Sequence, residues 1–277
     1  MNIKKLYGKY KKKLFNFFIP FKIRYFYKPT KGKPHHLDKE LVISLTSYRA
    51  RFKTLPLTLK CLLNQTVQPD QIILWIGFED KEYVTDEINK LTQYGLSIKF
   101  HENLRSFTKI IPTLEENLDR YVITADDDLY YPETLVEDLL IGALKHPNAV
   151  IANRTHRITL DENGLPRKYS EWEKRGYDNN HPELNFLTGV GGVLYPPHIL
   201  YKDVLNTGIF KELCPTNDDL WLYWMIRLNN NFVYHSETKF AIFTWPSSQK
   251  TALIHMHNKD ANDKQVIKLI DYYGFIR

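Results

Sequence analysis

Residues 121–132, YVITADDDLYYP, join a short run of β-branched and apolar residues to three consecutive carboxylates. The first four residues, 121–124, predict a short buried strand. Asp126, Asp127 and Asp128 would then follow the carboxyl end of this strand, which is where open α/β sheets bind their ligands. The stretch therefore predicts both an α/β fold and the position of its functional site.

The three carboxylates favour a metal site. Side chains alternate in an extended segment, so Asp126 and Asp128 would face one side and Asp127 the other. Two carboxylates on one side suit a hard divalent cation, whose charge offsets the repulsion that would otherwise raise one pKa. The alternatives are a solvated acidic turn, or aspartate caps on a helix that begins near Pro132 with Glu133 in its first turn.

Strands and helices alternate on the amino-terminal side of this stretch. Strands are predicted over residues 41–45, 71–76 and 97–100, and helices over residues 54–63, 85–94 and 109–118. Four strands and three helices within ~130 residues favour a mostly parallel Rossmann-type sheet flanked by helices. A G-x-G-x-x-G turn and a Walker loop are both missing, which argues against a dinucleotide or P-loop site.

The second half of the chain is less regular. After a predicted helix at 137–145 and a strand at 149–152, residues 154–182 are polar and weakly periodic, which is typical of a functional loop or an antiparallel insertion. Residues 186–197, FLTGVGGVLYPP, carry three glycines in an apolar segment. Such glycines indicate a close approach of the backbone to another group, or a structural bend.

Residues 217–228, NDDLWLYWMIRL, predict a helix that Asn217 can cap. Asp218 and Asp219 would lie in its first turn and therefore near the carboxyl edge of the sheet. Acidic residues in a first turn are also favoured by the helix dipole alone, so the pair could be purely structural.

Two histidines lie near the end of the chain, in the sequence LIHMH. In an extended segment His255 and His257 would share one side, which suits one metal ligand or one phosphate contact. Most histidines serve neither purpose, so this spacing alone only marks a candidate. Residues 264–273 predict a terminal helix.

The composition is that of a globular protein, with 43% hydrophobic and 25% charged residues among 277. This length suits one large domain or two fused halves. Cys61 and Cys214 are too few for a disulfide framework, which favours a reducing compartment. No run approaches the ~18 to 20 apolar residues of a membrane span, and no signal peptide opens the chain, so we expect a cytoplasmic protein.

The basic charge is concentrated in an amino-terminal arm. Residues 1–37 contain eleven Lys or Arg and no Asp or Glu, whereas the remaining 240 residues carry 27 basic and 32 acidic groups, a net charge of −5. Apolar positions at helical spacing predict a basic amphipathic helix that Pro20 limits. The positions are Ile3, Leu6, Tyr7, Tyr10, Leu14, Phe17 and Phe18.

Such an arm fits an anionic membrane surface, which residues 1–33 would contact. Nucleic acid is an alternative partner, but the acidic body and the lack of a nucleic-acid motif argue against it. A third possibility is that the helix docks on the chain's own body or on another subunit. We expect the protein on the inner face of the cell membrane, bound peripherally.

An α/β half that ends in D-x-D, a glycine-rich strand, an Asp-Asp pair that opens a helix and late histidines together resemble the GT-A glycosyltransferases. The chain is most similar to bacterial family-2-like enzymes of surface polysaccharide synthesis. The resemblance runs from residue 40 to residue 260 and rests on ITADDDLYYP, TGVGGVLYPP and NDDLWL. It implies a metal-dependent, inverting transfer of a hexose or N-acetylhexosamine from a nucleotide sugar, expected to be UDP-linked, to a glycan or lipid-linked saccharide.

The resemblance also implies a metal site. Asp126 and Asp128 would hold Mn²⁺ or Mg²⁺ against the diphosphate of the donor, with Asp127 beside the same donor. His255 or His257 would complete the metal shell.

The remaining implied roles concern the donor and the acceptor. Asp219, or failing that Asp218, would be the general base that takes the proton of the acceptor hydroxyl. The implied donor contacts are Thr46, Ser47, Arg49 and Lys109.

We expect the arm over residues 1–37, a nucleotide-sugar-binding half over 38–150 and an acceptor-binding, catalytic half over 151–277. The two halves would form one continuous GT-A domain from residue 38. One alternative is a nucleotidyltransferase, which usually has a glycine-rich basic phosphate loop that this chain lacks. Another is a non-catalytic, membrane-tethered carbohydrate-binding relative, against which the intact carboxylate motifs argue.

Overall fold

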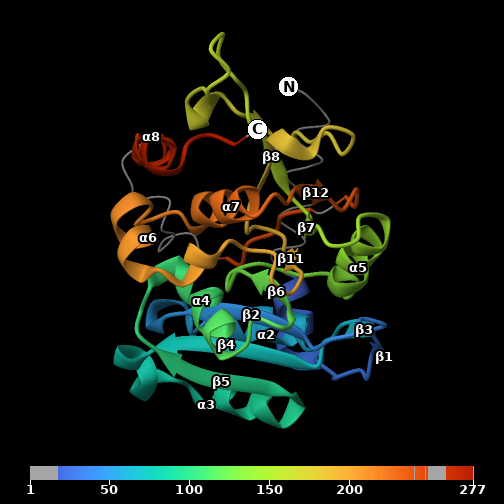
Figure 1. The fold of residues 1–277 in the computed structure, drawn as a ribbon. Coiled ribbons are helices and arrows are strands. Elements are labelled where there is room, and N and C mark those ends of the chain that lie inside the picture. Colours follow the sequence, from blue (N-terminus) through green and yellow to red (C-terminus); the bar gives the residue numbers. More distant parts are fainter. Residues whose placement is uncertain (1–17, 240, 247, 249–259, 277) are drawn as a thin grey trace, which may run out of the picture.

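The computed structural model describes residues 18–276 except 240, 247 and 249–259 (Figure 1). Its central sheet has seven strands in the order β12-β7-β11-β6-β2-β4-β5. Strand β11 is antiparallel to both of its neighbours, and the other pairs are parallel. The strands are β2 (Leu41–Ser47), β4 (Gln71–Gly77), β5 (Leu96–His101), β6 (Tyr121–Ala125), β7 (Val150–Ala152), β11 (Val193–Tyr195) and β12 (Val233–His235).

Helices cover both faces of this sheet, as the sequence predicts. They are α2 (Leu55–Leu62), α3 (Asp86–Asn89), α4 (Ile111–Glu116), α5 (Leu135–Lys145), α6 (Thr207–Leu213), α7 (Asp218–Leu228) and α8 (Ala261–Tyr273). Short 3₁₀ helices are η1 (Arg49–Arg51), η2 (Phe78–Tyr83), η3 (Lys90–Tyr94), η4 (Arg105–Lys109), η5 (Tyr169–Glu171), η6 (Pro182–Leu184) and η7 (Lys202–Leu205).

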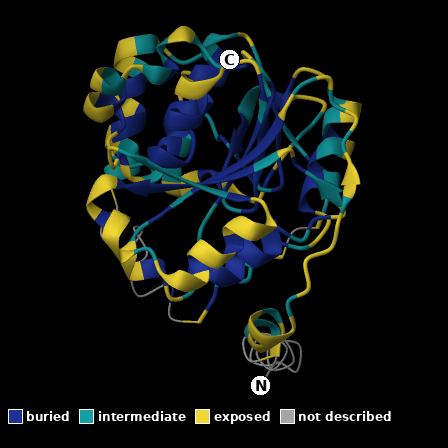
Figure 2. Ribbon diagram, turned by 90° about the horizontal axis from the view of Figure 1, so that it is seen from below, coloured by how far each residue is buried: buried dark blue, intermediate teal, exposed yellow. Residues whose placement is uncertain are grey.

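Two hydrophobic clusters lie on opposite faces because side chains alternate along each strand. On β6, Val122 belongs to a cluster with residues of α4, α6, α7 and α8, whereas Ile123 belongs to a cluster with residues of α2, α3 and α5. The sheet is therefore buried between two helical layers, which appear around the dark blue strands in Figure 2. The mostly parallel, helix-flanked α/β sheet predicted from the sequence is confirmed.

The predicted elements of the first half form, with differences at their ends. The strand predicted over 41–45 extends to Ser47, which pairs with Ile76 in the ladder of β2 and β4. The helix predicted over 109–118 is shorter in the structure: α4 spans Ile111–Glu116 and follows the separate 3₁₀ helix η4, because Pro112 lacks an N–H and favours the first turn of a new helix. Gly95 ends η3 with a left-handed φ of 101°, as expected of a helix stop.

The polar stretch after β7 is an antiparallel insertion, one of the two structures that its sequence favoured. It forms a three-stranded sheet in the order β10-β8-β9. The strands are β8 (Thr155–Arg157), β9 (Glu173–Lys174) and β10 (Asn185–Leu187). A separate parallel pair joins β1 (Lys33–Pro34) to β3 (Val67–Gln68).

The arm differs from the prediction at Pro20. Residues 18–26 are helical, so Pro20 lies inside a helical stretch instead of limiting it. Proline restricts the turn that precedes it, and the residues that follow can continue a helix. Residues 1–17 lie outside the described part of the chain. Among the residues that are described, no helix has both the length and the apolar character needed to cross a membrane.

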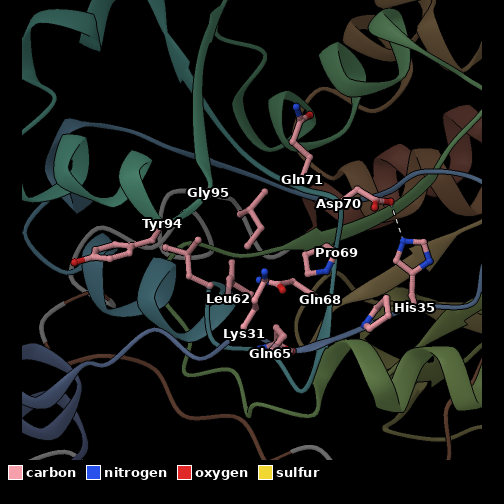
Figure 3. Close-up of a pocket in the computed structure, with 14 residues that line it drawn as sticks. Lys31, His35, Leu62, Gln65, Gln68, Pro69, Asp70, Gln71, Tyr94 and Gly95 are labelled. Atoms are coloured by element: carbon pink, nitrogen blue, oxygen red, sulfur yellow. Dashed lines mark hydrogen bonds and ion pairs between the residues drawn. The ribbon is translucent and has the colours of Figure 1, made fainter.

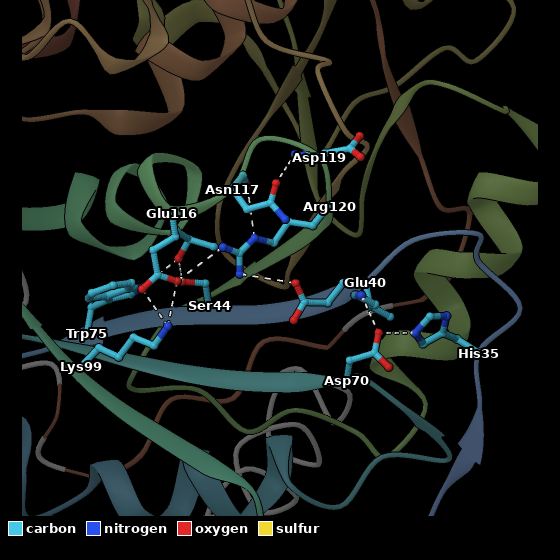
Figure 4. Close-up of polar contacts among 12 residues, drawn as sticks. His35, Glu40, Ser44, Asp70, Trp75, Lys99, Glu116, Asn117, Asp119 and Arg120 are labelled. Carbon is cyan, nitrogen blue, oxygen red and sulfur yellow. Dashed lines mark hydrogen bonds and ion pairs between the residues drawn. The ribbon is translucent and has the colours of Figure 1, made fainter.

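A polar network holds the amino end of β6 (Figure 4). The buried Arg120 donates from Nε to the carbonyl of Asn117 at 3.2 Å, and its terminal nitrogens lie 3.4 Å from Glu116 and 3.6 Å from Glu40. Lys99 reaches Glu116 at 2.7 Å. These contacts fix the start of the strand whose other end carries the three aspartates.

Candidate functional site

The chain turns immediately after β6. Asp127 and Asp128 form this turn, which packs against buried side chains. The N–H of Asp126 donates to the hydroxyl of Tyr131 at 2.8 Å, and the hydroxyl of Thr58 lies 3.0 Å from the carbonyls of both Asp127 and Leu129. The backbone of the carboxylate turn is thus held from two directions.

Because the segment is not extended, the alternation expected for the three aspartates is wrong. Asp127 and Asp128 both contact the guanidinium of Arg51, whereas Asp126 lies beside Lys109. The terminal nitrogen of Arg51 is 2.6 Å from Asp128 and 3.4 Å from Asp127. Arg51 comes from η1 and was not identified from the sequence, in which it carries no motif.

Asp127 is held by Arg51 and by Ser47, whose hydroxyl donates to its Oδ2 at 2.6 Å. Burial nevertheless raises the pKa of Asp127 to about 7, against the opposing effect of the Arg51 charge. Burial also raises the pKa of Asp126, and the positive charge of Lys109 opposes that shift. For both carboxyls, burial disfavours the charged form more than the neighbouring cation favours it.

Lys109 connects two sequence motifs that are far apart in the chain. Its Nζ lies 3.3 Å from Asp126 after β6 and 2.9 Å from Asp218 at the start of α7. Burial opposes the charged form of Lys109, but the charges of Asp218, Asp126 and Asp219 outweigh it and raise the pKa of the ammonium group well above its usual range. Lys109 consequently remains a cation between the two carboxylate motifs.

Asp219 lies at the first turn of α7, which Asn217 caps as predicted by accepting from the N–H of Leu220 at 3.1 Å. The Oδ1 of Asp219 accepts from the N–H of Gly189 at 3.0 Å. Burial, and then the neighbouring charge of Asp218, raise the pKa of Asp219 to about 7. This carboxyl can therefore gain or lose a proton near neutral pH.

Gly189 explains part of the glycine-rich segment. A Cβ at this position would lie 2.8 Å from Nζ of Lys109 and 3.1 Å from Oδ1 of Asp219. At Gly192, where φ is +94°, a Cβ would lie 2.9 Å from Leu135. The close backbone approach indicated by these glycines is confirmed, and at Gly189 the group approached is the candidate site itself.

A cavity of about 650 Å³ opens beside the carboxylate turn, and this volume is in the range of small-molecule sites. Arg49 and Arg105 lie along it with Asp80, whose Oδ2 accepts from the N–H of Arg49 at 3.0 Å. Its lining also includes every donor contact implied by the resemblance, namely Thr46, Ser47, Arg49, Lys109, Asp126, Asp127 and Asp128.

A second cavity, of about 490 Å³, lies at the opposite end of β4 (Figure 3). Its main polar feature is a contact of 2.8 Å between His35 and Asp70. Asp70 also accepts from the N–H of Leu41 at 2.8 Å, so it anchors the start of β2. Since parallel sheets bind ligands at their carboxyl ends, the cavity beside the aspartates is the better candidate.

The donor set beside the turn fits a hard divalent cation. Among the described residues, no three His, Cys, Asp or Glu side chains are grouped so as to hold a metal ion. Mg²⁺ is commonly held by one or two carboxylates, with phosphate oxygens and water as its other ligands. Asp126 and Asp128 both line the cavity and would supply two such carboxylates, but they contact different cations, Lys109 and Arg51, and their metal role stays a prediction. His255 and His257 lie outside the described residues, and their metal role stays a prediction.

Comparison with known proteins supports the fold. No protein-family model and no curated protein matches the chain. Among solved structures, the chain is similar to S. aureus TarS 1–349 in complex with UDP, with a TM-score of 0.52 and 12% identity over 84% of this chain and 66% of that one. The complex of the same protein with UDP-GlcNAc gives 0.52 and 13%, over 84% and 67%.

A synthase of 4-diphosphocytidyl-2C-methyl-D-erythritol from Anaerococcus prevotii DSM 20548 superposes with a TM-score of 0.48 and 16% identity, over 81% of this chain and 95% of that one. At such identities a likeness concerns the fold alone. With the strand order above, the TarS structures show that the chain has a GT-A-like α/β fold of the Rossmann type.

Proposed function

We propose that the chain is a metal-dependent, inverting glycosyltransferase of bacterial surface polysaccharide synthesis. It would move a hexose or N-acetylhexosamine from a UDP-sugar to a glycan or lipid-linked saccharide. The observation that carries this proposal is the position of Lys109, which joins the carboxylate turn to the Asp218–Asp219 pair beside a cavity of about 650 Å³. The two motifs are thus in contact through one side chain, which supports a single site.

The cavity supports the donor half of the reaction. Arg49 and Lys109 offer positive charge to a diphosphate, and Asp126 and Asp128 would hold a divalent cation at the same place. Such a cation, when bound, stabilises the charge that develops on the leaving nucleoside diphosphate. The TarS structures of the same fold contain UDP and UDP-GlcNAc, which supports a UDP-sugar as the donor.

The start of α7 supports the acceptor half. Asp218 is ion-paired with Lys109 at 2.9 Å and is therefore already engaged by a cation. Asp219 is oriented by the N–H of Gly189 instead, and its pKa of about 7 matches the requirement of a general base near neutral pH. Asp219 would take the proton of the acceptor hydroxyl as that oxygen attacks the anomeric carbon. Inversion needs one base and no enzyme nucleophile.

The test is a screen of nucleotide sugars with the purified protein in the presence of Mn²⁺. We expect one donor, a UDP-sugar, to be hydrolysed slowly to UDP and free sugar, and EDTA to stop the reaction. In parallel, nucleoside triphosphates are offered with sugar phosphates. Release of pyrophosphate in that arm, without UDP release in the first, would contradict the proposal and favour a nucleotidyltransferase.

A further inference from the structure

The helix at residues 18–26 is bound to the body along one side. Ile19, Ile23 and Tyr27 recur every fourth residue, and all three pack against the hydrophobic cluster that contains α2. The Tyr27 ring lies 5.9 Å from Nζ of Lys60, and a terminal nitrogen of Arg24 donates to the carbonyl of Lys53 at 3.4 Å. The orientation of this helix on the body is therefore fixed.

Its other side presents aromatic rings to solvent. Phe21, Tyr25 and Phe26 are 52%, 66% and 66% exposed. The ring of Phe21 lies 4.9 Å from that of Tyr25 and 5.9 Å from that of Phe26, so the three form one cluster, here called the aromatic face. Figure 2 shows this helix at the edge of the body, with exposed residues on its outer side. Grouped apolar side chains of this kind mark an interaction surface.

The positive charge around the aromatic face favours an anionic partner. Residues 18–37 contain Lys22, Arg24, Lys28, Lys31 and Lys33 and no acidic residue. Aromatic rings between cations match the boundary between anionic headgroups and acyl chains. A second copy of the chain would bring the same cations against each other, and this repulsion opposes self-association through this face.

The helix also lies close to the cavity beside the carboxylate turn. Arg24, Phe52 and Tyr83 line a surface depression together with Arg49 and Ala50, and the last two also line the cavity of about 650 Å³. The helix that carries the aromatic face thus borders, through Arg24, a depression whose Arg49 and Ala50 also line the cavity. A partner bound to this helix would lie near the site.

We propose that the aromatic face inserts into an anionic lipid surface and holds the site beside that surface. The described part of the helix, residues 18–26, is too short to span a bilayer and would lie in the headgroup region, with Ile19 and Ile23 still docked on the body. Surface binding does not depend on the chemistry of the site, so the two proposals can fail separately. Both together would favour a lipid-linked acceptor.

The test uses tryptophan as a depth probe in the full chain. The five native tryptophans are each 4% exposed or less, so lipid-borne quenchers should affect them little. Tyr25→Trp adds a tryptophan to the aromatic face. Tyr272→Trp, at a 58% exposed position on α8, is the matched control. Both variants are mixed with vesicles of brominated phosphatidylcholine, with or without 30% phosphatidylglycerol (about one lipid in three, to give an anionic surface).

We expect the emission of the Tyr25→Trp variant to shift to the blue and to be quenched only with the anionic vesicles, while that of the Tyr272→Trp variant stays unchanged. Salt should reverse the quenching, because exposed charges are screened over about 10 Å at 0.1 M salt. If the Tyr25→Trp variant sediments with the vesicles but is not quenched, other cations bind the lipid and the inference is wrong. Dimerisation abolished by Phe21→Ser would also overturn it and identify a second copy as the occupant.

Discussion

The two ends of β6 are both rich in charge, but they differ in balance. At the amino end, three cations meet three carboxylates, namely Lys39, Lys99 and Arg120 with Glu40, Glu116 and Asp119. At the carboxyl end, the ion pairs of the two carboxylate motifs join two cations to four carboxylates, namely Arg51 and Lys109 with Asp126, Asp127, Asp128 and Asp218, and Asp219 lies beside them. Counted over these ion-paired side chains, positive and negative charges balance only at the amino end.

Solvent exposure sharpens this difference. Glu40 and Glu116 keep 40% and 34% of their side chains exposed, so water solvates their carboxylates in part. Asp127 and Asp218 keep only 13% and 8%. Uncompensated carboxylates in a poorly hydrated place cost free energy of folding, and this cost is expected where a protein binds cations or moves protons. The amino end stabilises the fold, and the carboxyl end is the candidate site.

The largest expected difference between the two ends is in catalysis. Asp219→Asn keeps the shape of the side chain and removes its basicity, so sugar transfer should fall by about 10² or more while UDP binding survives. Glu116→Gln makes the same chemical change at the amino end and should leave transfer per folded molecule unchanged. Transfer near the wild-type rate in the Asp219→Asn variant would move the role to Asp218 or exclude an inverting mechanism.

The second largest expected difference between the two ends is in the metal dependence of UDP binding. In wild type, the UDP affinity measured by calorimetry should rise at least about tenfold when Mn²⁺ is present, because carboxylates and phosphate oxygens share such an ion. Asp128→Ala should abolish this dependence, and Asp127→Asn should matter less. The control Asp119→Asn lies at the amino end and should behave as wild type. Equal, metal-independent affinities in wild type and in Asp128→Ala would exclude the metal site.

Gly189 offers a steric test of the carboxyl end. In Gly189→Ala the new methyl group would lie 2.8 Å from Nζ of Lys109 and 3.1 Å from Oδ1 of Asp219, so one of them must move. We expect transfer to fall about tenfold, since small displacements of catalytic groups are costly. In the control Gly208→Ala, on α6, the nearest atom would be 3.4 Å away, and activity should not change. Equal kinetics in both variants would show that this approach has no role.

Much of the fold could be predicted because its signals are local. The strand before Asp126, the cap at Asn217 and the stop at Gly95 each depend on a few neighbouring residues. The division between η4 and α4 was also predictable from Pro112, since proline favours the first turn of a helix.

The candidate site was only partly predictable because its geometry depends on distant residues. Tyr131 and Thr58 bend the carboxylate turn, and Arg51 draws two of its side chains to one side. None of the three belongs to a recognisable pattern. From the sequence, we expect Lys109 only as a donor contact. The contact of Lys109 with Asp218 forms only because the fold brings η4 and α7 together.

The smallest expected effect is on stability, and its sign distinguishes the two ends. The pKa of Asp219 is raised to about 7 in the folded state, so the folded protein prefers the protonated form. Its favourable contribution is complete below the unfolded pKa of about 4 and is lost as the pH rises through about 7. Asp219→Asn removes this titration. From pH 5 to pH 8 the free energy of unfolding should therefore fall less in the variant than in wild type, by about 1 to 2 kcal/mol, allowing for partial exposure of the carboxylate. Urea unfolding at the two pH values measures the difference.

Glu116→Gln is the control at the amino end. It breaks contacts to Lys99 and Arg120 and should lower stability at both pH values. If Asp219→Asn loses activity while its stability at pH 8 rises, the wild-type carboxylate is kept for function at a cost in stability. Parallel curves of stability against pH for wild type and Asp219→Asn would show that folding does not disfavour the charged form of Asp219.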